Sequence, residues 1–334
     1  MSGARLLTIE PAWVLPGARV TLHGTGLRPA GVEMPRVSID GEPARVVMAS
    51  STRIGLLVPD RLAPGRHSVT VDGCSDSVEV QAGGVIASEI HQVDNPAIGP
   101  DGSVFLTMSG TRGQEVPISV FRVPPGAERE PYLSGLVNAT SLAFDALGVL
   151  HVSSRFDGAV YRVTPERTLE TVASDLGVAF GIAFGSDGTM YVGDRSGTVF
   201  RAGVTGRVVP YVSLPPSMAA YHLAIGPEDA LYVTAPTFGT YDRVYRIVRG
   251  HATAMSSEFG RPQGLAVSDD GDLYVVDAAA GCAGLYRVRD GQKRVMVLAA
   301  PALVGVALDP RGGLVVSSND TAYRLDVPLK PHTV

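Results

Sequence analysis

The sequence predicts an all-β protein in two parts: a small β-sandwich over residues 1–83 and a six-bladed β-propeller over residues 84–334. Two observations lead to this prediction. The first part holds short runs that alternate apolar with polar side chains between Pro and Gly turns, a pattern typical of antiparallel strands. In the second part a segment of about 41 residues recurs six times, which is the period of a four-stranded propeller blade.

The sandwich is predicted from seven strand-like runs within residues 5–81, separated by turns such as "LPG" (15–17) and "APG" (63–65). The runs are "RLLTI", "ARVTLHG", "RVSID", "ARVVM", "TRIGLLV", "RHSVTVD" and "SVEVQ". The stretch "IEPAWVLPGARVTLHGTGL", followed by "VSIDGEPARVV", "TRIGLLVP" and "PGRHSVTV", resembles the immunoglobulin-like TIG (IPT) domain along its whole length. "GGV" (83–85) is the expected junction with the propeller.

The propeller repeats align on the segment before each strand of the type "GxLYV", with starts at residues 94, 140, 180, 221, 263 and 304. Each repeat reads as an inner strand ("GIAF"), a turn, a second strand ("TMYVGD"), a third strand and an outer strand ("LETVAS"). The third strand is nearly copied each time: "SVFRV", "AVYRV", "TVFRA", "RVYRI", "GLYRV" and "TAYRL". Because one blade cannot bury both its faces, the repeats are expected to close into a ring.

The last blade is expected to lack its own outer strand, since "PLKPHTV" after "TAYRLDV" is short and broken by Pro. The strand-like "VIASEIHQV" (85–93) is spare at the other end of the repeats. We expect it to pair beside Ala322–Val327, which closes the ring and removes an open edge.

The arginine of the third strand recurs in all six copies and permits two interpretations. These residues could form an anion-binding ring, or they could cover apolar blade surface with their stems, as Arg often does. The scaffold interpretation is preferred because a third strand lies far from the axis. The six positions are Arg122, Arg162, Arg201, Arg246, Arg287 and Arg324.

The turns between first and second strands carry Gly in five repeats and Asp229 in the fourth. "SDDGDLYVVD" (268–277) therefore reads as a hairpin turn that needs positive φ, in preference to a calcium loop. The five glycines are Gly102, Gly148, Gly188, Gly271 and Gly312.

A candidate site is expected where the inner strands begin, because these turns converge on one mouth of the channel. A position that has only a structural role should carry the same residue type in every repeat, whereas the residue type at this position varies. The alternative is that these side chains only plug the channel. The aligned residues are Asp94, Thr140, Phe180, Tyr221, Gln263 and Val304, and their followers are Asn95, Ser141, Gly181, His222, Gly264 and Gly305.

Residues 85–327 resemble NHL repeats and the related gluconolactonase (senescence-marker) lactonases, through the pattern "xGLAxxxDGxLYVxD". The resemblance implies a divalent ion, often calcium, at the channel mouth, and Asp94 with Pro96 falls on the family's acidic position. The other ligand positions carry Phe180 and Tyr221, which do not suit calcium because that ion takes six to eight oxygens. No metal ligand set is therefore predicted, with calcium or another divalent ion at Asp94 as the alternative. Asn138 lies one residue out of register with a substrate-contacting asparagine of the family.

The chemistry of the mouth permits acid–base work or binding alone. Asp94, His222 and Tyr221 are the candidate catalytic residues, since burial moves the pKa of Asp and His toward neutrality; a His beside an Asp is also often a structural pair. Ligand contacts are expected from a larger set: Asn95, Asn138, Thr140, Phe180, Gln263, Arg112, Phe238 and Tyr241. Three long loops between second and third strands are expected to form a rim on that face: "SGTRGQEVP" (109–117), "APTFGTYDR" (235–243) and "DAAAGCAG" (277–284). Arg112, Phe238 and Tyr241 are included because they lie in the first two of these loops. The alternative is that the loop lengths vary without a function.

These features predict a small-molecule pocket at the channel mouth, with lactonase- or lyase-like chemistry (a hydrolase or lyase) if the protein is an enzyme. The alternative is a non-catalytic scaffold that binds a protein or glycan partner.

Composition narrows the setting. The net charge of −5 and the absence of a basic run argue against nucleic acid as a partner. No apolar run is long enough to span a bilayer, so no membrane partner is expected. "MSGARLLTIEP" lacks the apolar core of a signal peptide, which favours a cytoplasmic protein, or a secreted one if the natural start lies upstream. Cys74 and Cys282 are expected to be free thiols.

Overall fold

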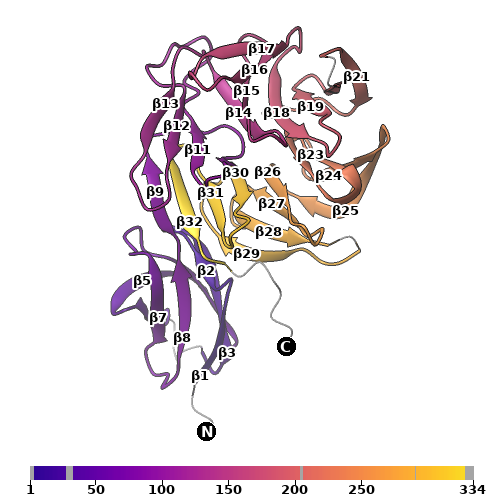
Figure 1. Cartoon of the computed structure of the whole chain (residues 1–334). Helices are drawn as coiled ribbons and strands as arrows, with labels where there is room; N and C mark the ends of the chain where they lie inside the picture. The colour runs from indigo at the N-terminus through magenta and orange to yellow at the C-terminus, as the bar shows by residue number, and fades with distance from the viewer. Residues whose placement is uncertain (1–3, 28–32, 204–205, 290, 328–334) are drawn as a thin grey trace.

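The computed structural model describes residues 4–27, 33–203, 206–289 and 291–327. Within these residues the chain forms strands β1 to β32 and a single 3-10 turn, Pro227–Asp229. Figure 1 shows the two parts, with the sandwich strands at the foot of the view and the propeller above them. An all-β protein with a propeller arrangement is therefore confirmed, and both cysteines are free.

In the sandwich, alternate side chains of β3 and of β7 are buried, as the alternation of apolar and polar residues predicts. β5 pairs with β6 on one side and with β4 on the other, and so links the two sheets β1-β3-β6-β5 and β4-β7-β8-β2. The strands are β1 (Arg5–Glu10), β2 (Trp13–Val14), β3 (Arg19–Thr25), β4 (Val37–Ile39), β5 (Glu42–Ala49), β6 (Arg53–Leu57), β7 (Gly65–Val71) and β8 (Ser77–Ala82).

The propeller repeats form antiparallel sheets in which each third strand pairs with both the second and the outer strand. The prediction for the six Tyr/Phe-Arg strands is therefore confirmed. The first three sheets comprise β10 (Ala97–Ile98), β11 (Val104–Thr107), β12 (Val120–Val123) and β13 (Glu130–Leu133); β14 (Ala139–Phe144), β15 (Leu150–Ser154), β16 (Ala159–Val163) and β17 (Leu169–Ala173); β18 (Ala179–Phe184), β19 (Met190–Asp194), β20 (Thr198–Ala202) and β21 (Val208–Ser213).

The later repeats follow the same order of strands. They comprise β22 (His222–Ile225), β23 (Leu231–Thr234), β24 (Asp242–Val248) and β25 (His251–Phe259); β26 (Pro262–Val267), β27 (Leu273–Asp277), β28 (Gly284–Val288) and β29 (Val295–Ala299); β30 (Gly305–Leu308), β31 (Leu314–Ser317) and β32 (Thr321–Leu325), with β9 (Gly84–Ser88). The innermost strands contact one another in the order β10, β14, β18, β22, β26 and β30, and β30 contacts β10.

The expectation of six separate blades needs a correction. Among the described residues five four-stranded sheets stand alone, whereas β26 to β29 belong to a 12-stranded sheet that includes the sandwich. The cause is β2, a two-residue strand that pairs in parallel with β8 on one side and with β29 on the other. Leu15, just after β2, packs into the core beside Leu298, and Ala299 packs into the sandwich core, so both parts share buried contacts.

The ring is closed by pairing between the two ends of the repeat region, as the sequence predicts. β9 runs antiparallel to β32, with Ala87 opposite Ala322 and Ser88 opposite Thr321. The strand is shorter than the predicted Val85–Val93, because Glu89 adopts a left-handed φ of 55° and the chain then turns inward. The tail "PLKPHTV" lies outside the described residues.

The turns between first and second strands have the backbone expected of them. Positive φ is found at all five predicted glycines and also at Asp229, which has a φ of 54°. The glycine values are 80° at Gly102, 75° at Gly148, 80° at Gly188, 81° at Gly271 and 110° at Gly312.

Candidate functional site at the channel mouth

The inner strands approach one another closely at the mouth. The residue that follows each aligned start must therefore be glycine or must carry a side chain that bonds to a neighbouring strand. A Cβ at Gly181 would lie 2.5 Å from the Tyr221 carbonyl oxygen, and one at Gly305 would lie 2.5 Å from that of Asp94. Where the follower is not glycine, its side chain bonds to a neighbouring strand: the amide of Ile182 donates to Ser141 Oγ, and the amide of Val306 donates to Asn95 Oδ1. Part of the variation at this position is therefore structural.

His222 and Asp94 form a buried pair that joins the fourth and first sheets across the ring. The imidazole Nδ1 lies 2.5 Å from Asp94 Oδ1, and both side chains are at most 1% exposed. Asp94 Oδ1 also accepts the Asn95 amide at 2.8 Å. His222 Nε2 is buried and has no hydrogen-bond partner. The pair thus links the first and fourth repeats at the mouth, and Nε2 of the imidazole has no hydrogen-bond partner.

A cavity of about 400 Å³ opens at the same mouth, and we call it the mouth pocket. Its apolar lining consists of Val93, Val178, Phe180, Met218, Val304 and the alanines at 219 and 220. Its polar lining consists of Gln92, Arg112, Arg155, Arg195, Gln263 and Asn319. Because these residues come from the starts of inner strands and from the loops after second strands, the fold itself places the pocket on the ring axis.

The predicted site residues divide into those that line the pocket and those that do not. Phe180, Gln263 and Arg112 line it, whereas Asp94, Tyr221 and His222 do not. Of the inner-strand residues expected at the site with acidic, aromatic, imidazole or amide side chains (Asp94, Phe180, Tyr221, His222 and Gln263), only Phe180 and Gln263 line the pocket. Tyr221 is fully buried, its hydroxyl donates to the Pro215 carbonyl, and burial raises the pKa of this phenol.

Three predicted ligand contacts have structural roles instead. Asn95 bonds to the backbone of two neighbouring inner strands, through Leu265 and Val306. Asn138 donates to the carbonyls of Ser109 and Thr111 and accepts the Gly113 amide, so it fixes the loop after β11. Thr140 donates to the Asn138 carbonyl at 2.7 Å.

The two predicted aromatic rim residues point to solvent. Phe238 is 91% exposed and Tyr241 is 64% exposed, and neither lines the mouth pocket. Their loop is nonetheless ordered, because Asp242 accepts the amide and the hydroxyl of Thr237.

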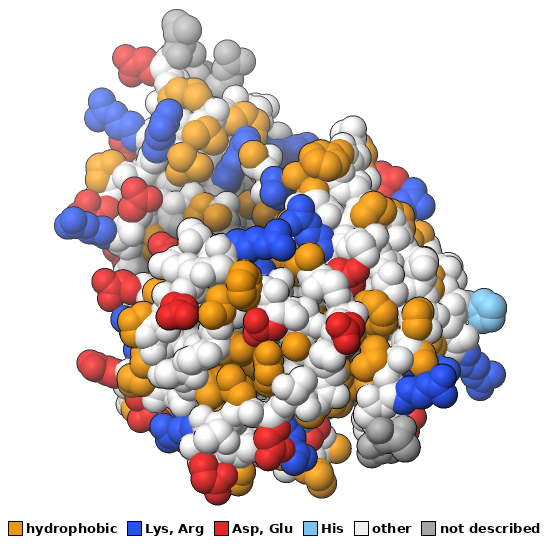
Figure 2. All heavy atoms as spheres, turned by 90° about the horizontal axis from the view of Figure 1, so that it is seen from above, with side chains coloured by type: hydrophobic (Ala, Val, Ile, Leu, Met, Phe, Trp, Pro, Cys, Tyr) orange, Lys and Arg blue, Asp and Glu red, His pale blue; other side chains and the backbone are white. Residues whose placement is uncertain are grey.

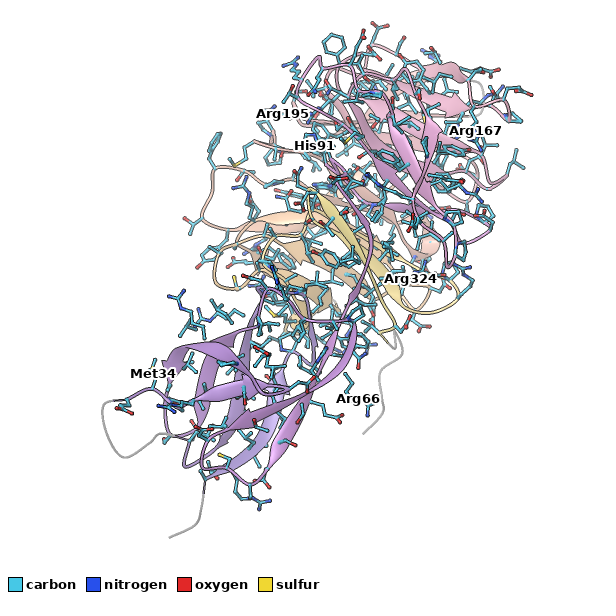
Figure 3. The ribbon with its side chains drawn as sticks, turned by 90° about the vertical axis from the view of Figure 1, so that its left-hand side faces the viewer. Met34, Arg66, His91, Arg167, Arg195 and Arg324 are labelled. Atoms are coloured by element: carbon cyan, nitrogen blue, oxygen red, sulfur yellow. The ribbon has the colours of Figure 1, made fainter. Side chains whose placement is uncertain are left out.

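Two charged lining residues are not predicted from the sequence, Arg155 and Arg195. Each directly follows a second strand, in "SSRFDG" and "GDRSG", so the available signal is an arginine at the same place in two successive repeats. Figure 3 shows Arg195 near His91 on one face of the propeller, with Arg167 and Arg324 toward the opposite face. Arg155 is half-buried, and burial, followed by the charges of Arg112 and Arg195, lowers its pKa. Burial, followed by the charge of Arg155, lowers the pKa of His91.

The donor set at the mouth does not fit calcium. Asp94 Oδ1 is already engaged with His222 and with the Asn95 amide, and the lining of the pocket carries three guanidinium groups. No cluster of three or more His, Cys, Asp or Glu side chains suited to a metal occurs in the described part of the chain. Calcium also requires a larger set of oxygen ligands than one engaged carboxylate provides.

Comparison with known proteins supports both parts of the fold. The family model of the IPT/TIG domain matches residues 4–85. A search of curated proteins finds no match. A gluconolactonase from Xanthomonas campestris is similar in structure, with a TM-score of 0.59, 16% identity, and coverage of 90% of this chain and 99% of its own.

Two further solved structures have other described activities. A virginiamycin B lyase from Staphylococcus aureus, in complex with quinupristin, matches with a TM-score of 0.54 and 14% identity, over 87% of this chain and 99% of its own. An auxiliary nutrient binding protein from Bacteroides ovatus matches with a TM-score of 0.53 and 14% identity, over 98% of this chain and 99% of its own. At such identities the likeness establishes a shared β-propeller fold, which is compatible with many functions. Within the described residues, no helix has the length and apolar character needed to cross a membrane.

Proposed function

We propose that this protein binds a small molecule in the mouth pocket. The observation that carries the proposal is a cavity of about 400 Å³ with a continuous apolar wall around Phe180 and a few convergent polar groups, the usual composition of a ligand site. In this proposal β26 to β29 count as a sixth blade, whose innermost strand contributes Gln263 to the pocket.

Unsatisfied polar atoms at the mouth support the same proposal. In the described residues the buried side-chain N and O atoms without a partner are Ser109 Oγ, Arg155 Nε, His222 Nε2 and Ser317 Oγ. All four belong to residues at the mouth end of their strands, at the start of β22 or at or just after the ends of β11, β15 and β31. Buried polar groups normally have partners, so their concentration at one end of the ring favours a polar ligand there.

The experiment is to fill the pocket and measure binding of fragment-sized acids, amides and lactones by ligand-observed NMR. Ala219→Trp places an indole in the pocket, and Ala127→Trp makes the same change in an exposed turn between β12 and β13. Fragments that bind the wild-type protein should be lost with Ala219→Trp and kept with Ala127→Trp. Fragments that remain bound to Ala219→Trp, or a library without a single binder, would overturn the proposal.

A finer proposal is acid–base chemistry of the hydrolase or lyase type at His222. Asp94 holds Nδ1 and so fixes the ring, which leaves Nε2 as the nitrogen that exchanges a proton with a substrate. Because His222 is fully buried and does not line the mouth pocket, this chemistry requires the substrate to displace the side chains between the pocket and the imidazole. The test is hydrolysis of dihydrocoumarin, a chromogenic lactone, by the wild type and by His222→Gln. Activity that His222→Gln abolishes in a folded protein supports the proposal; equal rates with both proteins reject it.

The alternative function, a scaffold for a glycan or protein partner, is favoured by Phe238 and Tyr241. Two exposed aromatic side chains on one ordered loop provide contact area without a fold-related reason. A glycan array probed with the wild type and with the Phe238→Ser, Tyr241→Ser double variant tests it. Binding that depends on the two rings supports this function, and an array without binding removes the glycan form of it.

A further inference from the structure

We infer that the mouth pocket selects a small organic anion, whose carboxylate or phosphate is bound by the guanidinium groups of Arg112, Arg155 and Arg195. This inference rests on the proposed small-molecule function and names the class of ligand. Three features support it: the origin of the three side chains, the absence of acidic partners for them, and the shape of the pocket.

The three arginines come from equivalent places in three successive sheets. Arg112 lies in the loop between β11 and β12, Arg155 in the loop between β15 and β16, and Arg195 in the loop between β19 and β20. All three line the same cavity. Because these loops rise on the same face of the ring, the positive charges converge on one side of the pocket. Seen from above the view of Figure 1, Lys and Arg side chains gather near the middle of the visible surface (Figure 2).

No carboxylate neutralises this cluster in the described part of the chain. The lining contains no Asp or Glu, and none of the three arginines forms a salt bridge there. The nearest acid in sequence, Asp194, already accepts the Val178 amide and the Ser196 hydroxyl. Two of the arginines donate to main-chain carbonyls: Arg155 Nη2 to Gly110 at 2.9 Å and Arg195 Nε to Ser217 at 3.4 Å.

An uncompensated cluster of this kind is electrostatically unfavourable, and an anion relieves it. Burial and the two neighbouring cations oppose the charge of Arg155, and its Nε is buried without a partner. Guanidinium groups present planar pairs of donors that match carboxylate and phosphate oxygens. A bound oxyanion supplies the missing acceptor and reduces the repulsion among the three arginines.

The rest of the pocket restricts the body of the ligand. Phe180 and Val178 contribute apolar lining, and Gln263 contributes an amide. The cavity volume of about 400 Å³ admits a body of one or two rings. The ligand class is therefore a small acid with an apolar or weakly polar body.

The test compares four probes by isothermal titration: phenylacetate, phenyl phosphate, the neutral phenylacetamide and inorganic phosphate. Arg112→Gln with Arg195→Gln removes two cations of the pocket without touching the half-buried Arg155. Arg61→Gln, an exposed arginine of the sandwich, is the control for loss of charge. Both aromatic acids should bind wild type more tightly than the amide, and the double variant should weaken them by about tenfold or more, as expected for charged hydrogen bonds. Arg61→Gln should change nothing.

The outcomes separate this inference from the proposed function. If phenylacetamide binds as tightly as phenylacetate, the double variant has no effect and Phe180→Leu weakens both, the pocket binds neutral molecules and only the anion inference fails. If inorganic phosphate alone binds, the site holds an inorganic ion and the organic-anion inference fails. If none of the probes binds, both the inference and the proposed function are contradicted. Phenylacetate and phenyl phosphate together show whether carboxylate or phosphate is preferred.

Discussion

The arginines of the third strands and the arginines of the mouth pocket are the same residue type in two different environments. Each third-strand arginine has a partner within its own repeat: Arg122 binds Asp101 and Glu130, Arg162 binds Glu170, and Arg324 binds Asp309. Arg201, Arg246 and Arg287 contact the tyrosines Tyr211, Tyr232 and Tyr274. Arg155 at the mouth bonds to the Gly110 carbonyl of the preceding repeat, and Arg195 bonds to the Ser217 carbonyl in the connection that leads to β22.

Within these two groups of arginines, recurrence in every repeat goes together with a partner inside the protein. An arginine that recurs in every repeat is matched by an acid or an aromatic ring that the same repeat provides. The three arginines of the mouth pocket form no salt bridge among the described residues, so their charge is available to a ligand. Variants of the two groups should therefore differ in their effects on stability. A larger loss is expected at the buried pair of Asp94 and His222, which belongs to neither group.

The buried pair at the mouth should behave as scaffold, because both of its members have a partner. His222→Ala leaves the Asp94 carboxylate buried without the imidazole, and breaking such a pair costs about 3 kcal/mol of the free energy of unfolding or more. Denaturant titration measures the loss. His251→Ala, at an exposed position, is the control and should have little effect. A His222→Ala protein as stable as the wild type contradicts the division.

The acid that binds a third-strand arginine should stabilise the protein in a pH-dependent way. Burial alone would raise the pKa of Asp309, but hydrogen bonds from Arg311 and Arg324 outweigh it and lower the pKa to about 2. The folded-state pKa is thus below the unfolded value of 3.8, so this stabilisation is present above pH 4 and is lost as the pH falls toward 2.

Asp309→Asn should therefore reduce the free energy of unfolding at pH 7 by about 1 to 2 kcal/mol, the usual worth of charged hydrogen bonds. Near pH 2 the variant and the wild type should be equally stable. A difference that does not depend on pH between 2 and 5 would show that the carboxylate charge is unimportant.

The mouth arginines should contribute nothing to stability. Arg112→Gln with Arg195→Gln relieves like-charge repulsion, so the free energy of unfolding should stay within about 0.5 kcal/mol of the wild type or rise slightly. Arg324→Gln, which loses its bond to Asp309, should be less stable than the double variant. If denaturant titration gives Arg324→Gln a higher free energy of unfolding than the double variant, the distinction between the two groups of arginines is wrong.

The smallest effect is expected from calcium. The mouth pocket is lined by three cations, and the Asp94 carboxylate below it is already engaged with His222, so the mouth should not attract a divalent ion. Calcium and EDTA should therefore give the same melting temperature. A calcium-dependent rise of several degrees would show that acidic groups dominate the mouth.

The sequence predicts the parts of the fold that depend on repetition and alternation. The third strands, the turn glycines and the pairing of β9 with β32 follow from period and pattern. β2 could not be predicted, because two residues carry no alternation and its role depends on two partners, β8 and β29, that are distant in sequence. The merging of one propeller sheet with the sandwich could not be predicted for the same reason.

The site could be predicted as a place but not as a set of residues. The converging inner strands place a pocket at the mouth, and Phe180 and Gln263 line it. Tyr221 and Asn138 were expected there as polar groups, but their side chains bond to nearby backbone, which depends on loop geometry that a sequence pattern does not encode. Arg155 and Arg195 lie in loops between second and third strands, which differ in length from repeat to repeat and so escape an alignment based on the inner strands.

The pairing of β9 with β32 also has a consequence for the biosynthesis of the protein. β9 leaves the ribosome with the end of the sandwich, but its partner follows about 230 residues later, roughly 10 to 50 s at usual rates of translation. During this interval the sandwich has all its own strands and can fold. The backbone groups of β9, and those on the edge of β2 that later pairs with β29, remain unpaired. Such edges readily pair with other chains. The nascent chain is therefore most prone to aggregation after the sandwich has folded and before the last repeat is made, so a stop codon late in the gene should harm solubility more than one directly after the sandwich.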